Sequence, residues 1–231
     1  MGLGSSFGIS SETNNNIQTD GLIGYWDAAY KKSYPRSGTT WTDLAGSNNG
    51  TLTNGPTFSS DFNGLIEFDG TNDSVTFGTP SELVFDADEQ FSTSVWIQKE
   101  NQSTSQVILQ QRRTVIGIGY DGVAGTSTNV PYSFIGATAT NASTVLQDDV
   151  WYHIATTYNN QSFKLYVNAV AEGSGTRNKE SDSGQTVFIG THAGATNYFK
   201  GKVVNLSYYS RELSASEILQ NYNAQKQRFG Y

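Results

Sequence analysis

The sequence predicts an all-β protein built as a sandwich or a barrel. Only 15% of the 231 residues are charged, and glycine, serine, threonine and asparagine are abundant. The chain also has 13 Tyr and 12 Phe residues. Aromatic residues favour strands, and small polar residues favour tight turns. Roughly a dozen strand-like segments recur at intervals of about 8–15 residues, which is typical of sandwiches and barrels.

The first predicted strands lie between residues 22 and 77. Leu22–Asp27 is a short apolar run. Ile66–Phe77 is predicted to be a hairpin that turns at Gly70-Thr71-Asn72, since apolar and polar residues alternate on both sides of that turn. The alternation turns the acidic side chains outward and directs four apolar side chains into the core: Ile66, Phe68, Val75 and Phe77.

The later strands show the same pattern. In Phe91–Ile97 the alternate residues share one face, namely Phe91, Thr93, Val95 and Ile97. Further strands are predicted at residues 106–112, 114–122, 132–140, 150–158, 163–171, 186–192 and 202–210. The sequence does not indicate how the strands between residues 98 and 146 pair.

One helix is predicted near the C-terminus, within residues 211–225. Ser214 as N-cap and Glu217 three residues later form a capping box, and Leu213 with Ile218 forms a hydrophobic staple. An apolar stripe of Ile218, Leu219 and Tyr222 is expected to dock the helix on the sandwich. We therefore predict one domain, residues 19–231, preceded by a polar N-terminal arm, residues 1–18.

Composition argues against several classes of partner. The formal net charge is −7, and no basic run exceeds two residues, so nucleic acid is not an expected partner. No apolar run approaches the roughly 20 residues of a membrane helix, and the N-terminus lacks a Sec-type signal pattern. There is no cysteine, which excludes disulfides and thiolate metal sites.

Four segments in order resemble the concanavalin A-like, laminin G-type jelly roll. They are GLIGYWDAAYKKSYPRSGTTWTDLAGSNNGTLTNGPTF, IEFDGTNDSV, VWYHIATTYNNQSFKLYVNAV and FKGKVVNLSYYSRELSASEILQNYNAQKQR. Three positions depart from the family pattern without threatening the fold: Ala45, Ala169 and Ser207. The resemblance implies two antiparallel sheets packed face to face with a closing helix. It also implies binding of glycans or proteins, in some members with calcium, while some relatives are glycoside hydrolases.

The acidic residues do not supply the set of carboxyl groups that glycoside hydrolysis needs. Laminarinase-type relatives of this fold carry three acids on one strand, and Glu67 with Asp69 matches the first two. The third position is Thr71 or Asn72, so one catalytic acid is missing, and Asp73 lies past the turn. Two further acid pairs fall in predicted loops and are interpreted as solvated: Asp86 with Asp88, and Asp148 with Asp149.

The chain also lacks the residues that nucleophilic catalysis needs, because it has no Cys and no G-x-S-x-G motif. His153 lies in a predicted strand on the same face as Trp151 and Ala155, which indicates a packed or hydrogen-bonded histidine rather than a catalytic base. His192 lies in a loop without an evident partner. We therefore assign no catalytic, cofactor-binding or metal residue and predict that the chain is not an enzyme.

Calcium and glycan binding stay open. Asp69, Asn72 and Asp73 offer hard oxygen ligands for calcium, although the same residues suit a plain turn, which we favour. Glycans would stack on exposed aromatic side chains. The candidates lie in or beside predicted loops: Trp41, Tyr120, Tyr132 and Tyr198. The alternative is that these side chains cap the ends of the sandwich.

The opening motif resembles that of proteins in bacteriophage genomes, especially marine ones, and in environmental bacteria. The expected function is therefore that of a virion structural protein, such as a capsid decoration or a tail or fibre component. It would be made in the host cytoplasm and located in the virion. The N-terminal arm would contact other virion proteins or copies of itself, and loops would bind surface glycans. The alternative is a bacterial glycan-binding module or adhesin, and a glycoside hydrolase is the least favoured.

Overall fold

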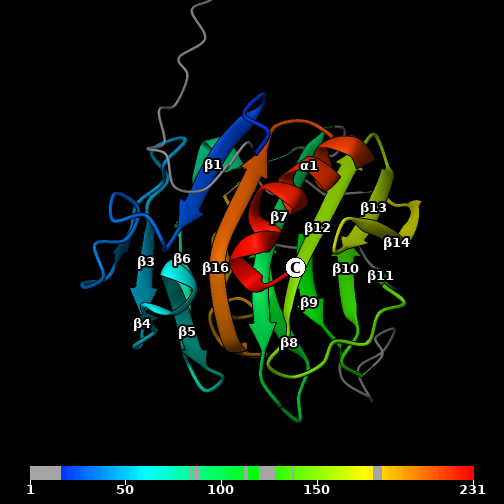
Figure 1. Cartoon of the computed structure of the whole chain (residues 1–231). Coiled ribbons are helices and arrows are strands. Elements are labelled where there is room, and N and C mark those ends of the chain that lie inside the picture. Colours follow the sequence, from blue (N-terminus) through cyan, green and yellow to red (C-terminus); the bar gives the residue numbers. More distant parts are fainter. Residues whose placement is uncertain are drawn as a thin grey trace, which may run out of the picture.

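The two-sheet antiparallel architecture is confirmed, with one short helix outside the sheets (Figure 1). The computed structural model describes residues 17–83, 85, 89–111, 114–119, 128–136, 138–178 and 184–231. No helix within these ranges is long and apolar enough to cross a membrane. The helical elements are the α-helix α1 (Ala215–Gln225) and the 3₁₀ turns η1 (Asp61–Asn63), η2 (Ser81–Leu83) and η3 (Lys226–Phe229).

Sheet A has the strand order β14-β13-β12-β7-β16-β5-β4, and β1 also pairs with β16. Its strands are β1 (Leu22–Asp27), β4 (Thr57–Ser59), β5 (Leu65–Asp69), β7 (Phe91–Lys99), β12 (Trp151–Asn159), β13 (Ser162–Val167), β14 (Val170–Thr176) and β16 (Lys200–Tyr209). All pairings in this sheet are antiparallel.

Sheet B has the order β11-β10-β9-β8-β15-β6-β3-β2. Its strands are β2 (Thr40–Trp41), β3 (Gly50–Thr53), β6 (Ser74–Thr76), β8 (Gln106–Gln111), β9 (Thr114–Ile118), β10 (Pro131–Ile135), β11 (Thr138–Asn141) and β15 (Val187–Ile189). The segment whose pairing the sequence left open, residues 98–146, therefore supplies the meander β8-β9-β10-β11.

The main core lies between the two sheets. Its side chains come from both sheets at alternate strand positions, as the period of two requires. The four core residues predicted from the alternation in β5 and β6 are all buried: Ile66, Phe68, Val75 and Phe77. Phe91, Val95 and Ile97 of β7 are buried with them, and the Thr93 hydroxyl donates to the Ser207 carbonyl at 3.0 Å.

The predicted hairpin within Ile66–Phe77 is wrong. β5 pairs with β4 and β16 in sheet A, whereas β6 pairs with β3 and β15 in sheet B. The turn is therefore a corner through which the chain crosses from one sheet to the other. The Asp73 carboxylate accepts from the Asp69 N–H at 2.9 Å. Asp73 is buried inside the corner, so the expectation that all the acids face outward is also corrected.

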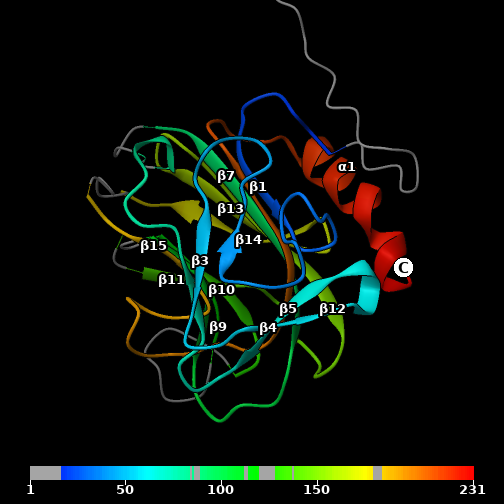
Figure 2. The same ribbon diagram turned by 90° about the vertical axis from the view of Figure 1, so that its left-hand side faces the viewer.

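The predicted helix is present, and its capping box of Ser214 and Glu217 is confirmed. α1 covers the face of sheet A that points away from sheet B (Figure 2). Ile218 is buried there and Tyr222 is partly buried, but Leu219 is 46% exposed. The predicted stripe is thus wrong at Leu219, because neighbouring helix positions are about 100° apart and Ile218 already faces the sheet.

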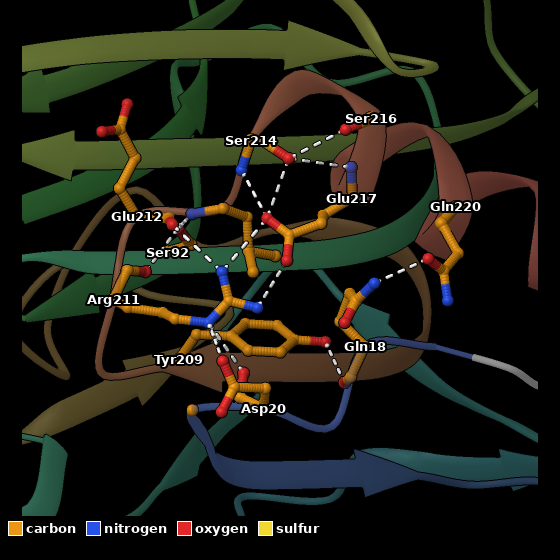
Figure 3. Close-up of polar contacts among 12 residues, drawn as sticks. Gln18, Asp20, Ser92, Tyr209, Arg211, Glu212, Ser214, Ser216, Glu217 and Gln220 are labelled. Carbon is orange, nitrogen blue, oxygen red and sulfur yellow. Dashed lines mark hydrogen bonds and ion pairs between the residues drawn. The ribbon is translucent and has the colours of Figure 1, made fainter.

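The segment that leads into β1 is held against α1 (Figure 3). The Gln18 N–H donates to Asn221 Oδ1 at 2.7 Å, and the Tyr209 hydroxyl donates to the Gln18 carbonyl at 3.0 Å. Arg211 lies between the Asp20 carboxylate at 3.1 Å and the Glu217 carboxylate at 2.6 Å. The segment that precedes β1 is therefore fixed at this end of the sandwich. Residues 1–16 of the predicted arm lie outside the described residues.

The C-terminal end is fixed by a buried ion pair. Arg228 Nη1 donates to both oxygens of Asp27, at 3.0 and 3.1 Å, and its Nη2 donates to the Gly64 carbonyl at 2.6 Å. Gln225 Nε2 donates to the Tyr25 hydroxyl, which itself donates to Asp27. Tyr25, Trp26 and Asp27 of the opening motif are thus buried and stabilise the fold, and they are not exposed to a partner or ligand.

Candidate functional site

An open hollow of about 390 Å³ lies at one end of the sandwich. Its lining is polar and comes from three chain segments: Asp69, Gly70, Asn101, Gln102, Ser103 and Lys200. The side chains of Asp69, Asn101 and Ser103 are exposed, and the Lys200 side chain is 41% exposed. A ligand that enters the hollow therefore meets carboxylate, amide, hydroxyl and ammonium groups.

The strand register brings these segments together. β16 lies between β5 and β7 in sheet A, and all three strands have an end here. Asp69, the last residue of β5, is directly opposite Lys200, the first of β16. β7 ends at Lys99 opposite Gly201, and the Glu100 N–H donates to the Lys200 carbonyl at 3.0 Å. The positions of the lining residues are thus set by paired backbone.

Gln102 ties the walls of the hollow to one another. The two N–H groups of its Nε2 are shared among three acceptors: the Gly70 carbonyl at 3.3 Å, Thr104 Oγ1 at 3.1 Å and the Tyr198 carbonyl at 3.2 Å. These acceptors belong to the corner after β5, the loop after β7 and the segment before β16. Gln102 is therefore a positioning residue that holds three loops in one arrangement.

Gly70 is required by the shape of this wall. Its φ is +77°, a region that residues with a side chain rarely adopt. A Cβ at this position would lie 2.6 Å from Gln102 Oε1 and 2.7 Å from the Lys200 Cβ. A larger residue would therefore displace the Gln102 side chain and press against Lys200 at the start of β16.

Asp69 is the carboxylate that lines the hollow. Its Oδ1 accepts from the backbone N–H groups of Thr71 at 2.7 Å and Asn72 at 3.3 Å. Burial acts to raise the pKa of Asp69, but these backbone donors outweigh it, and the net shift is downward. Asp69 is therefore ionised at neutral pH.

The predicted calcium ligands are used by the corner itself. Asp69 accepts from backbone N–H groups, Asp73 accepts from the Asp69 N–H, and the Asn72 carbonyl accepts from Asn54 Nδ2 at 3.1 Å. Burial raises the pKa of Asp73. Within the described ranges no group of three or more His, Cys, Asp or Glu side chains could hold a metal ion. The turn interpretation accounts for these contacts, and calcium stays a hypothesis for experiment.

The other acidic candidates do not converge on the hollow. Glu67 lies on β5 and accepts from Thr57 Oγ1 at 3.4 Å. Asp148 forms an ion pair with the buried Lys99, and Asp149 is an exposed turn residue whose φ is +61°. Asp86 and Asp88 lie outside the described residues.

The two histidines differ in burial, since His153 is buried and His192 is exposed. His153 is buried against the rings of Trp96 and Tyr222, with centroid distances of 5.4 and 6.0 Å. Burial lowers the pKa of His153 to about 3. The packed histidine predicted from the strand pattern is therefore confirmed. His192 is exposed in a short turn, where its N–H donates to the Thr196 carbonyl at 2.8 Å.

Two of the four aromatic candidates are buried and therefore not available for stacking. Trp41 and Tyr132 are buried, and Tyr120 lies outside the described residues. Tyr198 is half-buried, and its carbonyl accepts from Gln102 beside the hollow. Sequence reasoning missed Asn101, Gln102, Ser103 and Lys200. Asn101–Ser103 has the composition of any polar loop, and Lys200 is brought to it only by the strand register.

Residues 69–219 match the family described as the concanavalin A-like lectin/glucanases superfamily. The match covers well over half of the chain, so the chain belongs to this superfamily. The laminin G-type resemblance found in the sequence is thereby confirmed at the level of the family. No curated protein matches the sequence.

Solved structures share the fold at low sequence identity. The binding domain of Paraclostridial Mosquitocidal Protein 1 has a TM-score of 0.70 at 14% identity, over 89% of this chain and 52% of that one. Domain 4 of AbnA, a GH43 extracellular arabinanase from Geobacillus stearothermophilus, was solved in complex with arabinotriose. It has a TM-score of 0.66 at 16% identity, over 87% of this chain and 98% of that one.

Trypanosoma rangeli sialidase in complex with the inhibitor DANA has a TM-score of 0.66 at 14% identity. The match covers 89% of this chain but only 33% of the sialidase. The present chain thus spans about a third of that enzyme's length. At these identities the similarities establish the fold alone.

Proposed function

We propose that this protein is a non-enzymatic glycan-binding domain and that its binding site is the hollow between Asp69, Asn101 and Lys200. The observation that carries the proposal is the set of exposed polar side chains held by three paired strand ends. Sugar hydroxyls both donate and accept, which suits carboxylate, amide and hydroxyl partners in one rigid site. The arabinotriose complex of an arabinanase domain with the same fold supports glycan as the ligand class.

Isothermal titration tests the proposal, with ligands chosen from a glycan array that includes arabinotriose. We expect the double substitution Asn101→Ala with Ser103→Ala to weaken binding of the best ligand at least tenfold. Asn223→Ala, an exposed change on α1, is the matched control and leaves binding unchanged. Equal affinity of the double variant and the native chain would place the site elsewhere. Titrations with calcium and with chelator determine whether the corner takes up the ion.

The non-enzymatic part of the proposal rests on the acidic residues. A retaining glycosidase needs two carboxyl groups about 5–5.5 Å apart on either side of the scissile bond. Asp69 lines the hollow, while Asp73 is buried in the corner behind it. We expect no release of reducing ends from laminarin, arabinan or agarose. Release that is abolished by Glu67→Gln would overturn this part of the proposal.

We further propose that the domain acts in a bacteriophage particle, as a capsid decoration or a tail or fibre component. The similarity of the opening motif to phage-encoded proteins supports this role. Other virion proteins or further copies of the chain would be its partners, and host-surface glycans its ligands. Proteomics of purified particles tests the proposal, and consistent absence of the chain would refute it. Detection on a bacterial surface instead would favour the adhesin alternative.

A further inference from the structure

The charges around the hollow are unequal. Lys200 is the only cation that lines it among the described residues, and Lys200 Nζ lies 3.7 Å from the Glu100 carboxylate. Asp69 forms no ion pair within the described part of the chain, although it lies opposite Lys200 in the strand register. The Lys200 ammonium is thus paired with Glu100, and among the described residues the Asp69 carboxylate has no cation within ion-pair distance.

We propose that the hollow selects uncharged glycans and discriminates against sugars that carry carboxylate or sulfate groups. The inference rests on the proposed function, since it concerns the ligand class of the same site. An acidic group in the hollow meets the Asp69 carboxylate, and among the described residues the only cation in the lining, Lys200, already lies 3.7 Å from Glu100. The net charge of −7 on the chain adds a repulsion of the same sign at longer range.

Asp69 also favours the binding of a neutral sugar directly, through hydrogen bonds. An ionised carboxylate only accepts hydrogen bonds, and a sugar hydroxyl is the donor that it requires. The Asn101 amide and the Ser103 hydroxyl donate as well as accept, so they fit the remaining hydroxyls. The lowered pKa of Asp69 keeps its charge in place across the neutral range in which glycans are assayed.

The test compares matched pairs of glycans that differ only by a sialic acid or a sulfate group. We expect the native chain to bind the neutral member at least tenfold more tightly. Asp69→Asn narrows this affinity ratio about three- to tenfold, as expected from removing one like charge at about 5 Å in a solvent-exposed site whose effective dielectric constant is close to that of water. Asp69→Asn keeps the oxygen that accepts from Thr71 and Asn72, so the corner retains its turn.

Glu82→Gln is the matched control, because it removes one negative charge from an exposed residue in η2, a turn that lies beside β1. We expect Glu82→Gln to leave the ratio of the affinities for the neutral and the acidic glycan unchanged. In the native chain, 1 M salt should narrow that ratio, because salt screens the repulsion between the charges. Equal or tighter binding of the acidic member would overturn the inference and leave the proposed function intact. An unchanged ratio in Asp69→Asn would also overturn it. Binding to no glycan would refute the proposed function itself.

Discussion

His153 is a buried histidine on the outer face of sheet A, packed under α1. Trp96 and Tyr222 lie against it, and its backbone N–H donates to Asn168 Oδ1 at 3.0 Å. Because burial lowers its pKa to about 3, the imidazole is neutral in the folded chain at any pH above that value. In the unfolded chain it takes up a proton near its ordinary pKa of about 6.5.

This difference predicts a loss of stability in acid. The folded state binds fewer protons at this site, so the contribution of His153 is complete above pH 6.5 and declines as the pH falls toward 3. Between pH 7.5 and 4.5 we expect a loss of roughly 3 kcal/mol from this group. Urea denaturation of the native chain and of His153→Gln measures the difference, since the carboxylates titrate in both. Parallel pH dependence in the two proteins would contradict the assignment.

Asp27 is the second residue on which stability depends. The side chain of Asp27 is 1% exposed and that of Arg228 is 9% exposed. Removing one partner of such a pair leaves a buried charge without compensation and costs about 3–5 kcal/mol. We therefore predict that Asp27→Asn lowers the free energy of unfolding by that amount. Glu100→Gln, which breaks the exposed pair with Lys200, should cost less than about 1 kcal/mol. Equal costs for the two changes would contradict the burial of the Asp27 pair.

At the scale of single elements, the β5–β6 corner shows what alternation can and cannot predict. Ile66 and Phe68 face the core from sheet A, and Val75 and Phe77 face the same core from the opposite side. A hairpin and a sheet-crossing corner give the same pattern of apolar positions. Burial was therefore predicted correctly, while the pairing was not, because hydrogen bonds between strands leave no mark on the pattern of side chains.

The docking of α1 gives a prediction with an internal control. Ile218 is fully buried against sheet A, whereas the adjacent Leu219 is 46% exposed. Ile218→Ala should lower the free energy of unfolding by about 2–5 kcal/mol through lost burial and a cavity. Leu219→Ala should change it by less than about 0.5 kcal/mol. Denaturant titration of both variants checks this, and a larger effect at Leu219 would mean that the helix docks with a different face.

At the scale of the molecule, the class of fold followed from the sequence, but the candidate site did not. Strand patterns, turn residues and the capping box are local, so they could be recognised along the chain. The hollow depends on Lys200 lying opposite Asp69, 131 positions apart by number and adjacent only through the register of β16 with β5. The burial of Trp41 could not be predicted for a related reason, since a residue beside a loop can still be covered by the core.

The segment that precedes β1 and the hollow lie at opposite ends of β16, the long orange strand of Figure 1. Lys200 begins this strand at the hollow, and Tyr209 ends it beside Gln18. Nine residue steps of about 3.3 Å separate them by roughly 30 Å. A domain anchored through its N-terminal segment would therefore hold the hollow away from the anchor.

This geometry predicts how immobilisation affects binding. The chain has no cysteine, so a single substitution gives one attachment point. We expect full glycan binding when the chain is attached through Ser210→Cys, next to Tyr209, and loss of most binding through Ser103→Cys, in the wall of the hollow. Surface plasmon resonance with glycan in solution makes the comparison. Equal binding from both orientations would contradict the position of the site.

The central claim is that the hollow is a glycan site, and a crystal structure of the chain with its tightest neutral glycan tests it most directly. We expect a sugar ring bound between Asp69, Asn101, Ser103 and Lys200, with its hydroxyls hydrogen bonded to the Asp69 carboxylate. A glycan found on the α1 face or on the outer face of sheet B, with the hollow holding only solvent, would contradict it.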